Sequence, residues 1–187
     1  MKYFVSGGAR VGSSLMMSIL GESGIKINYS KEYEAVLQQF NKPDYLVNKM
    51  FYETGFVGRL TNKYISELED LSATKISLKA VSEIRDFSNV KIILMTRDIT
   101  SSWLSFKHSF LKEGVPFDKD LWLTKTSAQV EVSRRLAAKH PTKLMEVDYN
   151  KLIENPITTL SLLKDFGIPL NTELGVKSIN PKLRRFY

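Results

Sequence analysis

Short apolar runs alternate with longer amphipathic stretches along the whole chain. The runs at residues 3–6, 90–95 and 144–148 have the length of strands, and the second is nearly continuous and rich in β-branched residues, as expected of a strand covered on both faces. Further strands are predicted at residues 25–28 and 75–81, the latter ending near Lys79. Apolar residues recur at helical spacing over residues 15–20, 32–40, 57–71, 99–112, 118–139 and 155–166. This alternation predicts an α/β fold with a mainly parallel sheet.

Composition narrows the class of protein. The 187 residues contain no repeat or linker, so a single domain over 1–187 with a proper core is expected. The 27 Lys and Arg against 20 Asp and Glu favour anionic partners, but their scattered placement argues against nucleic acid. Cysteine is absent, which excludes disulfides and Cys-ligated metals. With no apolar run near the ~20 residues of a membrane span and no signal peptide, a cytoplasmic protein is expected.

The first candidate site is the glycine-rich stretch between the first strand and the first helix. Gly7 and Gly12 have the spacing of a phosphate-binding loop, and the expected binding residues are Gly8, Ala9, Arg10, Val11, Gly12, Ser13 and Ser14. Glycines let successive N–H groups point into one concavity, to which the helix N-terminus adds positive charge. Ser13 stands where nucleotide hydrolases have Lys, so ATP or GTP hydrolysis is not expected. The alternative is a plain turn between strand and helix.

A second candidate site lies at the end of the strand over residues 90–95. Arg97 follows this strand, and Ser105 comes eight positions later, within the first turns of the next predicted helix. Ligands of open parallel sheets bind beyond the carboxyl ends of the strands, and a guanidinium with a hydroxyl suits a phosphate monoester. The alternative is an exposed arginine paired with Asp98.

Both stretches resemble the cofactor motifs of one enzyme family. Residues 5–15, V-S-G-G-A-R-V-G-S-S-L, look like the 5′-phosphosulfate loop of sulfotransferases, which typically reads V-S-G-x-P-R-S-G-T-S/T-x. Residues 93–105 resemble that family's 3′-phosphate motif, an Arg at a strand end with Ser eight positions later. Residues 147–156 and 166–168 are similar to its Y-x-x-L…x-P…F-L-G-I segment. The chain resembles a short, bacterial- or phage-like member, because it is shorter than most of the family.

The resemblance implies a single three-layer domain with the P-loop NTPase-like sulfotransferase fold. It also implies that the cofactor is 3′-phosphoadenosine 5′-phosphosulfate (PAPS), whose sulfuryl group passes to a hydroxyl or amine and leaves adenosine 3′,5′-bisphosphate (PAP). Carried over by position, Arg10, Gly12, Ser13 and Ser14 hold the 5′-phosphosulfate, and Arg97 with Ser105 holds the 3′-phosphate. Ala9, Val11 and Ser13 depart from the usual Pro, Ser and Thr, and Val11 either weakens the loop or re-packs it.

The catalytic residues implied by the resemblance are Glu53 and Lys79. Some sulfotransferases use as base a Glu within an aromatic-rich Y/F-E segment, which Phe51-Tyr52-Glu53 resembles; the alternative is a surface carboxylate. Other members use a His two residues after a strand-end Lys. Lys79 matches that Lys, but Val81 stands where the His would be, so Lys79 either assists the leaving group without a neighbouring base or is an exposed strand end. No metal is expected, since cations cover the leaving phosphate.

Three functional hypotheses remain open on the sequence. The leading one is a PAPS-dependent sulfotransferase acting on a small-molecule, glycan or lipid acceptor. A small P-loop nucleotide kinase is the second, and a nucleotide-binding module without turnover is the third. The short chain also leaves room for acceptor-binding elements that are trimmed or shared within a homo-oligomer.

Overall fold

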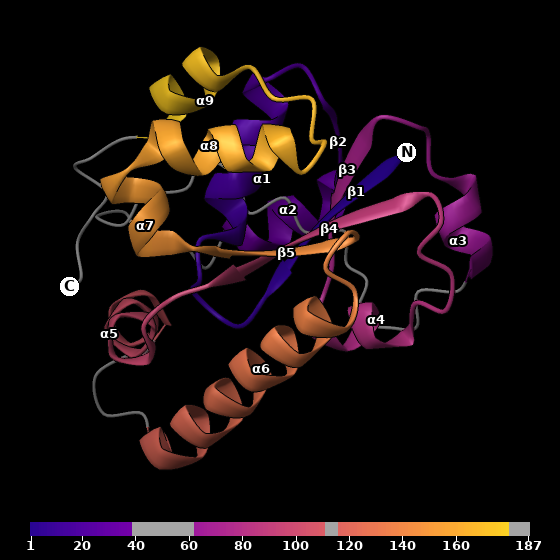
Figure 1. Cartoon of the computed structure of the whole chain (residues 1–187). Coiled ribbons are helices and arrows are strands. Elements are labelled where there is room, and N and C mark those ends of the chain that lie inside the picture. The colour runs from indigo at the N-terminus through magenta and orange to yellow at the C-terminus, as the bar shows by residue number, and fades with distance from the viewer. Residues whose placement is uncertain (39–61, 111–115, 180–187) are drawn as a thin grey trace.

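A parallel sheet forms the centre of the molecule. The computed structural model describes residues 1–38, 62–110 and 116–179. Within these residues the sheet has five strands in the order β2-β3-β1-β4-β5, and every neighbouring pair is parallel (Figure 1). The strands are β1 (Lys2–Gly7), β2 (Lys26–Asn28), β3 (Ser72–Lys75), β4 (Val90–Thr96) and β5 (Leu144–Asp148).

Helices cover both faces of this sheet and make a three-layer α/β domain. One face carries α1 (Ser13–Glu22), α7 (Tyr149–Glu154), α8 (Pro156–Asp165) and α9 (Thr172–Ser178); the other carries α3 (Asn62–Glu67), α4 (Leu78–Glu83) and α6 (Lys119–Lys139). The helices α2 (Lys31–Gln38) and α5 (Ile99–Phe110) follow the carboxyl ends of β2 and β4. The expected fold class is confirmed.

Two apolar clusters explain why the central strands are nearly continuous runs of buried residues. Tyr3 and Val5 of β1 pack toward α1 and α8, whereas Phe4 packs toward α4. β4 divides in the same way, with Ile93 facing the first cluster and Ile92 the second. Successive side chains of a strand point to opposite faces, so a strand with helices on both sides must be apolar at every position.

The predicted strand over residues 75–81 is wrong. The strand of this region is β3, which ends at Lys75, and α4 occupies Leu78–Glu83. The Ser77 hydroxyl caps α4 by accepting the Ala80 N–H at 3.2 Å. Leu78 and Val81 are both buried, and their spacing of three places them on one helical face. The alternation of polar and apolar residues that predicted a strand is therefore the start of a capped helix.

The remaining differences concern the lengths and number of helices. The helix expected over residues 57–71 is α3, Asn62–Glu67, with residues 57–61 outside the described part of the chain. The helices α7 and α9 were not predicted, because each is short and is set by a local cap: Asp148 accepts the Lys151 N–H, and Asn171 accepts the Leu174 N–H. Across the described residues, no helix combines the length and the apolar character needed to span a membrane.

Candidate functional site

The loop that joins β1 to α1 is held tightly against its neighbours. Gly7 ends β1, and Gly12, with a φ of 88°, precedes the first residue of α1. A Cβ on Gly12 would collide with the Tyr149 ring, and a Cβ on Gly7 would collide with the carbonyl oxygen of Met95. Both ends of the loop therefore need glycine. Gly12 is needed for its left-handed backbone and for the close approach of Tyr149, and Gly7 is needed for the close approach of the Met95 carbonyl.

Between these glycines, the loop sends one side chain into the core and leaves others at the start of α1. Val11 is only 1% exposed and belongs to the apolar cluster beneath α1. The valine that stands in place of the usual Ser therefore makes a core contact. Ala9 is exposed, and Ser13 and Ser14 are half-buried. Gly12 provides no side-chain cap, and the first turn of α1 contains no acidic residue. N–H groups at such a helix end suit an anion.

Arg10, Arg97 and Ser105 lie together beside this loop. The Nε of Arg10 donates a hydrogen bond to Ser105 Oγ at 3.2 Å, although the two residues are 95 positions apart in the chain. The Nη1 of Arg97 donates to the backbone carbonyl of Arg10 at 3.4 Å. Arg97 is 8% exposed and Ser105 is 4% exposed. Two residues predicted at one strand-to-helix junction thus meet the cation predicted at another.

Further contacts hold Arg97 and the start of α5 in position. The Arg97 guanidinium lies over the Tyr149 ring, 4.4 Å from its centroid. The Asp98 carboxylate caps α5 by accepting the Ser101 N–H at 2.8 Å. Arg97 is therefore buried against the loop and an aromatic ring, which differs from the alternative of an exposed arginine. Tyr149, which contacts both Gly12 and Arg97, was not among the predicted site residues.

A third cation approaches the loop from β3. The Nζ of Lys75, the last residue of that strand, donates to Ser14 Oγ at 3.3 Å. Lys75 was not among the predicted site residues, because the predicted end of the strand fell four residues too late. In the motif that Lys79 was matched to, a His stands two residues after the strand-end Lys. With β3 ending at Lys75, that position is Ser77, which caps α4.

Lys79, the predicted strand-end lysine, lies in the first turn of α4. Its side chain is exposed, and its carbonyl accepts a hydrogen bond from Ser82 Oγ at 2.7 Å. The structure thus joins Lys75, and not Lys79, to the loop. A catalytic role for Lys79 remains a prediction from the resemblance.

Two carboxylates bear on the prediction of a catalytic base. Glu53, the predicted base, lies outside the described residues. Glu34 of α2 is 6% exposed, and α2 begins just after β2 at the same sheet edge as Lys75. Glu34 follows Tyr33, so it also fits the aromatic–Glu pattern that pointed to Glu53. The aromatic–Glu pattern could therefore have pointed to Glu34, but the burial of its carboxylate is seen only in the structure.

The helix α6 covers the other side of the loop with polar groups. A Cβ added to Gly8 would lie 3.2 Å from the Oε1 of Gln129, which projects from α6. At the end of β4, Thr96 donates to Glu146 Oε1 at 3.0 Å, and Arg134 of α6 lies 3.6 Å from the same oxygen. The loop is thus enclosed between α6, α5 and Tyr149.

The topology explains why these residues gather at one place. From β1 the chain passes to α1 on one face of the sheet, whereas from the neighbouring β4 it passes by α5 to α6 on the other face. Ligands of doubly wound sheets bind in the crevice outside the carboxyl ends of such strands. Arg10 and Arg97 flank this point, and the arrangement of N–H groups, hydroxyls and cations fits a phosphorylated ligand.

Comparisons with known proteins support the fold. No family model matches the chain, and no curated protein matches it. Among solved structures, the chain is similar to retinol dehydratase in complex with androsterone and the inactive cofactor PAP, with a TM-score of 0.57 and 15% identity over 95% of this chain. It is equally similar to retinol dehydratase with retinol and PAP, with a TM-score of 0.57 and 14% identity over 94% of this chain. The chain spans 62% of the length of each.

These structural similarities establish the fold of the chain. They do not assign the chain to a particular member of a family. The chain shares the α/β fold of these structures, with a parallel sheet between two layers of helices, in agreement with the expected fold class. Both neighbours were solved with PAP, and their other ligands are small molecules. At this identity, what they bind is a property of those proteins.

Proposed function

We propose that the protein is a PAPS-dependent sulfotransferase that moves the sulfuryl group to a hydroxyl or amine without a metal ion. The observation that carries the proposal is the meeting of Arg10, Arg97 and Ser105 beside a glycine-rich loop. These groups lie at the crevice where this kind of sheet binds ligands. The fold is shared with structures that hold PAP.

The residues at the crevice fit the proposed cofactor. PAPS carries anionic groups at both ends of its ribose, and the donors gathered at this edge of the sheet are backbone N–H groups, hydroxyls, guanidinium groups and an ammonium. The loop with Ser13 and Ser14 would hold the 5′ end, and Arg97 with Ser105 would hold the 3′-phosphate. When bound, PAPS supplies the sulfuryl group to be transferred.

The protein's own contribution is positioning and electrostatics. Preorganised donors aimed at developing charge usually lower the barrier of such transfers more than any other single effect. Lys75 and Ser14 lie together at the β3 side of the loop, where they would stabilise negative charge at the 5′ end. Because these cations neutralise the phosphate, we expect turnover to persist when a chelator removes divalent metals. A nucleotide kinase would instead require Mg²⁺.

A carboxylate base completes the site. We propose Glu53 from the resemblance, and Glu34 as a second candidate because it is buried in α2, which follows β2 at the carboxyl edge of the sheet where β3 ends in Lys75. A base must lie within reach of the acceptor proton, and its neutral isostere removes the function while keeping the shape. The exposed Glu32, on the same helix as Glu34, provides a matched control. Of Glu53→Gln, Glu34→Gln and Glu32→Gln, one of the first two should abolish turnover while preserving PAP binding.

The test of the function has two stages. The first compares the affinities for PAP, ATP and AMP by calorimetry, and tight binding of PAP alone is expected. Preference for ATP with a requirement for Mg²⁺ would favour the kinase. The second follows labelled sulfate from PAPS to sugars, lipids, peptides and small alcohols, retinol and androsterone included. PAP binding with no transfer to any acceptor would favour a binding module without turnover.

The cellular context of the protein rests on predictions from its sequence. Three expectations are carried over as proposals: a cytoplasmic location, no nucleic-acid partner and a homo-oligomer. The acceptor assay serves the last of these if activity is followed against protein concentration.

A further inference from the structure

The side chain of Arg10 points toward α5. Its Nε donates to Ser105 Oγ at 3.2 Å, and the same residue offers its backbone carbonyl to Arg97 Nη1 at 3.4 Å. Arg10 has a φ of 63°, which is uncommon for a residue other than glycine. Arg10 is thus a non-glycine residue in the left-handed region that contacts both Ser105, through its side chain, and Arg97, through its carbonyl.

The positive charge around the loop is divided between its two sides. β1 lies between β3 and β4 in the sheet. Lys75 comes from the end of β3 and contacts Ser14, whereas Arg97 and Ser105 come from the β4 side. The hydrogen bond of Arg10 places its guanidinium on the β4 side. Among the residues that the structure describes, Lys75 therefore lies on one side of the loop, and Arg10 and Arg97 lie on the other.

We propose that Arg10 binds the 3′-phosphate of the nucleotide together with Arg97 and Ser105, and thereby sets the selectivity for nucleotides that carry this group. The inference rests on the proposed function and deepens it. Two guanidinium groups and a hydroxyl can surround a phosphate monoester with several charge-assisted hydrogen bonds. The 5′ end is left to the loop N–H groups, Ser13, Ser14 and Lys75. The resemblance assigns Arg10 to the 5′-phosphosulfate, so the two assignments differ in a measurable way.

Binding of three probes separates the assignments: adenosine 3′,5′-bisphosphate, adenosine 3′-monophosphate and adenosine 5′-monophosphate. Arg10→Asn removes the cation and keeps a residue that tolerates the left-handed backbone. We expect it to weaken both 3′-phosphorylated probes about 10-fold to 100-fold, the range for a hydrogen bond to a charged group. Its affinity for adenosine 5′-monophosphate should stay within about twofold. The matched variant Lys75→Met should weaken the two 5′-phosphorylated probes and spare adenosine 3′-monophosphate.

A spectroscopic readout uses the bisphosphate alone. Its two phosphates give separate ³¹P resonances, and Arg10→Asn should shift the bound 3′ signal while leaving the 5′ signal in place. Arg10→Lys retains the charge without the planar fork, so we expect a smaller loss of affinity with the same pattern. It also provides the measurement if Arg10→Asn does not fold.

The outcomes distinguish this inference from the function beneath it. If Arg10→Asn weakens adenosine 5′-monophosphate and the bisphosphate by the same factor, Arg10 serves the 5′ end and the inference is overturned. The sulfotransferase proposal would survive that result. If the unmodified protein binds the bisphosphate no better than adenosine 5′-monophosphate, the proposed function itself fails.

Discussion

The two ends of the parallel sheet use their cations in different ways. At the amino end, cations donate hydrogen bonds to backbone carbonyls or pair with carboxylates. The Nζ of Lys2, in a side chain that is 7% exposed, donates to the carbonyls of Ile65 at 2.6 Å and Ser66 at 3.1 Å in the last turns of α3. The N-terminal amine lies 3.0 Å from Asp70. These contacts join β1 to α3 and β3, so they belong to the fold.

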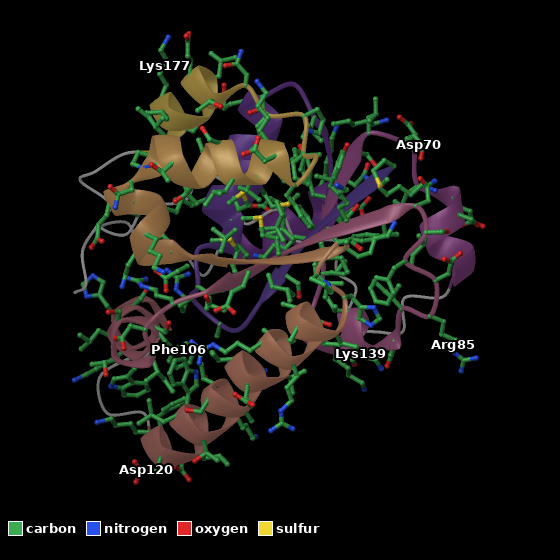
Figure 2. All side chains as sticks on the ribbon, in the orientation of Figure 1. Asp70, Arg85, Phe106, Asp120, Lys139 and Lys177 are labelled. Carbon is green, nitrogen blue, oxygen red and sulfur yellow. The ribbon has the colours of Figure 1, made fainter. Side chains whose placement is uncertain are left out.

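At the carboxyl end, Arg97 also donates to a backbone carbonyl, that of Arg10, but the cations there make two further kinds of contact. Lys75 and Arg10 donate to the hydroxyls of Ser14 and Ser105, and Arg97 packs on the Tyr149 ring. A hydroxyl that accepts from a cation can turn and donate to a phosphate oxygen, because its proton rotates freely. The comparison teaches that the cations at the amino end join elements of the fold, whereas those at the carboxyl end lie at the edge beyond which parallel sheets bind ligands. Figure 2 also shows Phe106, next to Ser105 in sequence, on α5 where it faces α6.

The largest effect that sharpens this comparison is expected at the two ends of α1. Gly12 and Gly24 both have a φ of 88°, but a Cβ on Gly12 would enter the Tyr149 ring, whereas a Cβ on Gly24 has nothing within 4 Å. Gly24→Ala introduces only the strain of a left-handed backbone and should lose about 1–2 kcal/mol of unfolding free energy. Gly12→Ala adds the overpacking of a tight contact and should lose about 2–5 kcal/mol in total.

Urea unfolding and PAP binding are measured on both variants. Gly12→Ala should also abolish PAP binding, because the loop has to move away from Tyr149 and Arg97. Gly24→Ala, beyond the far end of the same helix, should bind PAP as the unmodified protein does. Equal losses of stability and of affinity in the two variants would contradict the idea that the loop is held by close approach.

The next effect concerns Arg97. Removing its guanidinium in Arg97→Ala should cost about 1.5–3 kcal/mol of PAP binding free energy, the range for hydrogen bonds to charged groups. Calorimetry on the folded variant measures it, and Tyr149→Phe, which keeps the aromatic ring under the guanidinium, is the control. Unchanged PAP affinity in folded Arg97→Ala would remove the 3′-phosphate assignment.

The parts of this site that were predictable are those encoded by local spacing. β1 and β4 are apolar runs between breakers, and the residues that follow each strand must lie at the same sheet edge. Arg97 and Ser105 belong to one strand-to-helix junction, so their proximity follows from the chain itself. The fold class could be predicted for the same reason, since alternating strands and helices leave few topologies.

The parts that were missed depend on contacts between distant segments or on caps. β3 contains Ser72 and Thr74, small polar residues that bond to the Asn28 side chain, and no apolar run marks it. Its end at Lys75 was therefore misplaced, and with it the strand-end lysine. The bond from Arg10 to Ser105 joins residues 95 positions apart and depends on a side-chain rotamer. No local pattern could indicate it.

At the amino end, the effect should appear in stability alone. Lys2→Met keeps most of the aliphatic volume but removes the amine that bonds the α3 carbonyls. We expect a loss of about 1.5 kcal/mol of unfolding free energy, the usual size for a bond to a charged group at the edge of burial. PAP affinity should not change, since Lys2 lies at the opposite end of β1 from the loop. Weakened PAP binding would mean that the two ends are coupled.

The smallest effect is a pH dependence at the same end. The hydrogen bond from the N-terminal amine holds the pKa of Asp70 below its ordinary value of 3.8. A carboxylate whose pKa is lower in the folded state adds stability above its ordinary pKa and loses that contribution as pH falls through the folded value. Urea unfolding between about pH 2 and 6 should therefore show a steeper decline for the unmodified protein than for Asp70→Asn. Since Asp70 is exposed, the two curves should differ by little and should converge at the acid end. Parallel curves across the range would show that the amine does not stabilise the Asp70 carboxylate in solution.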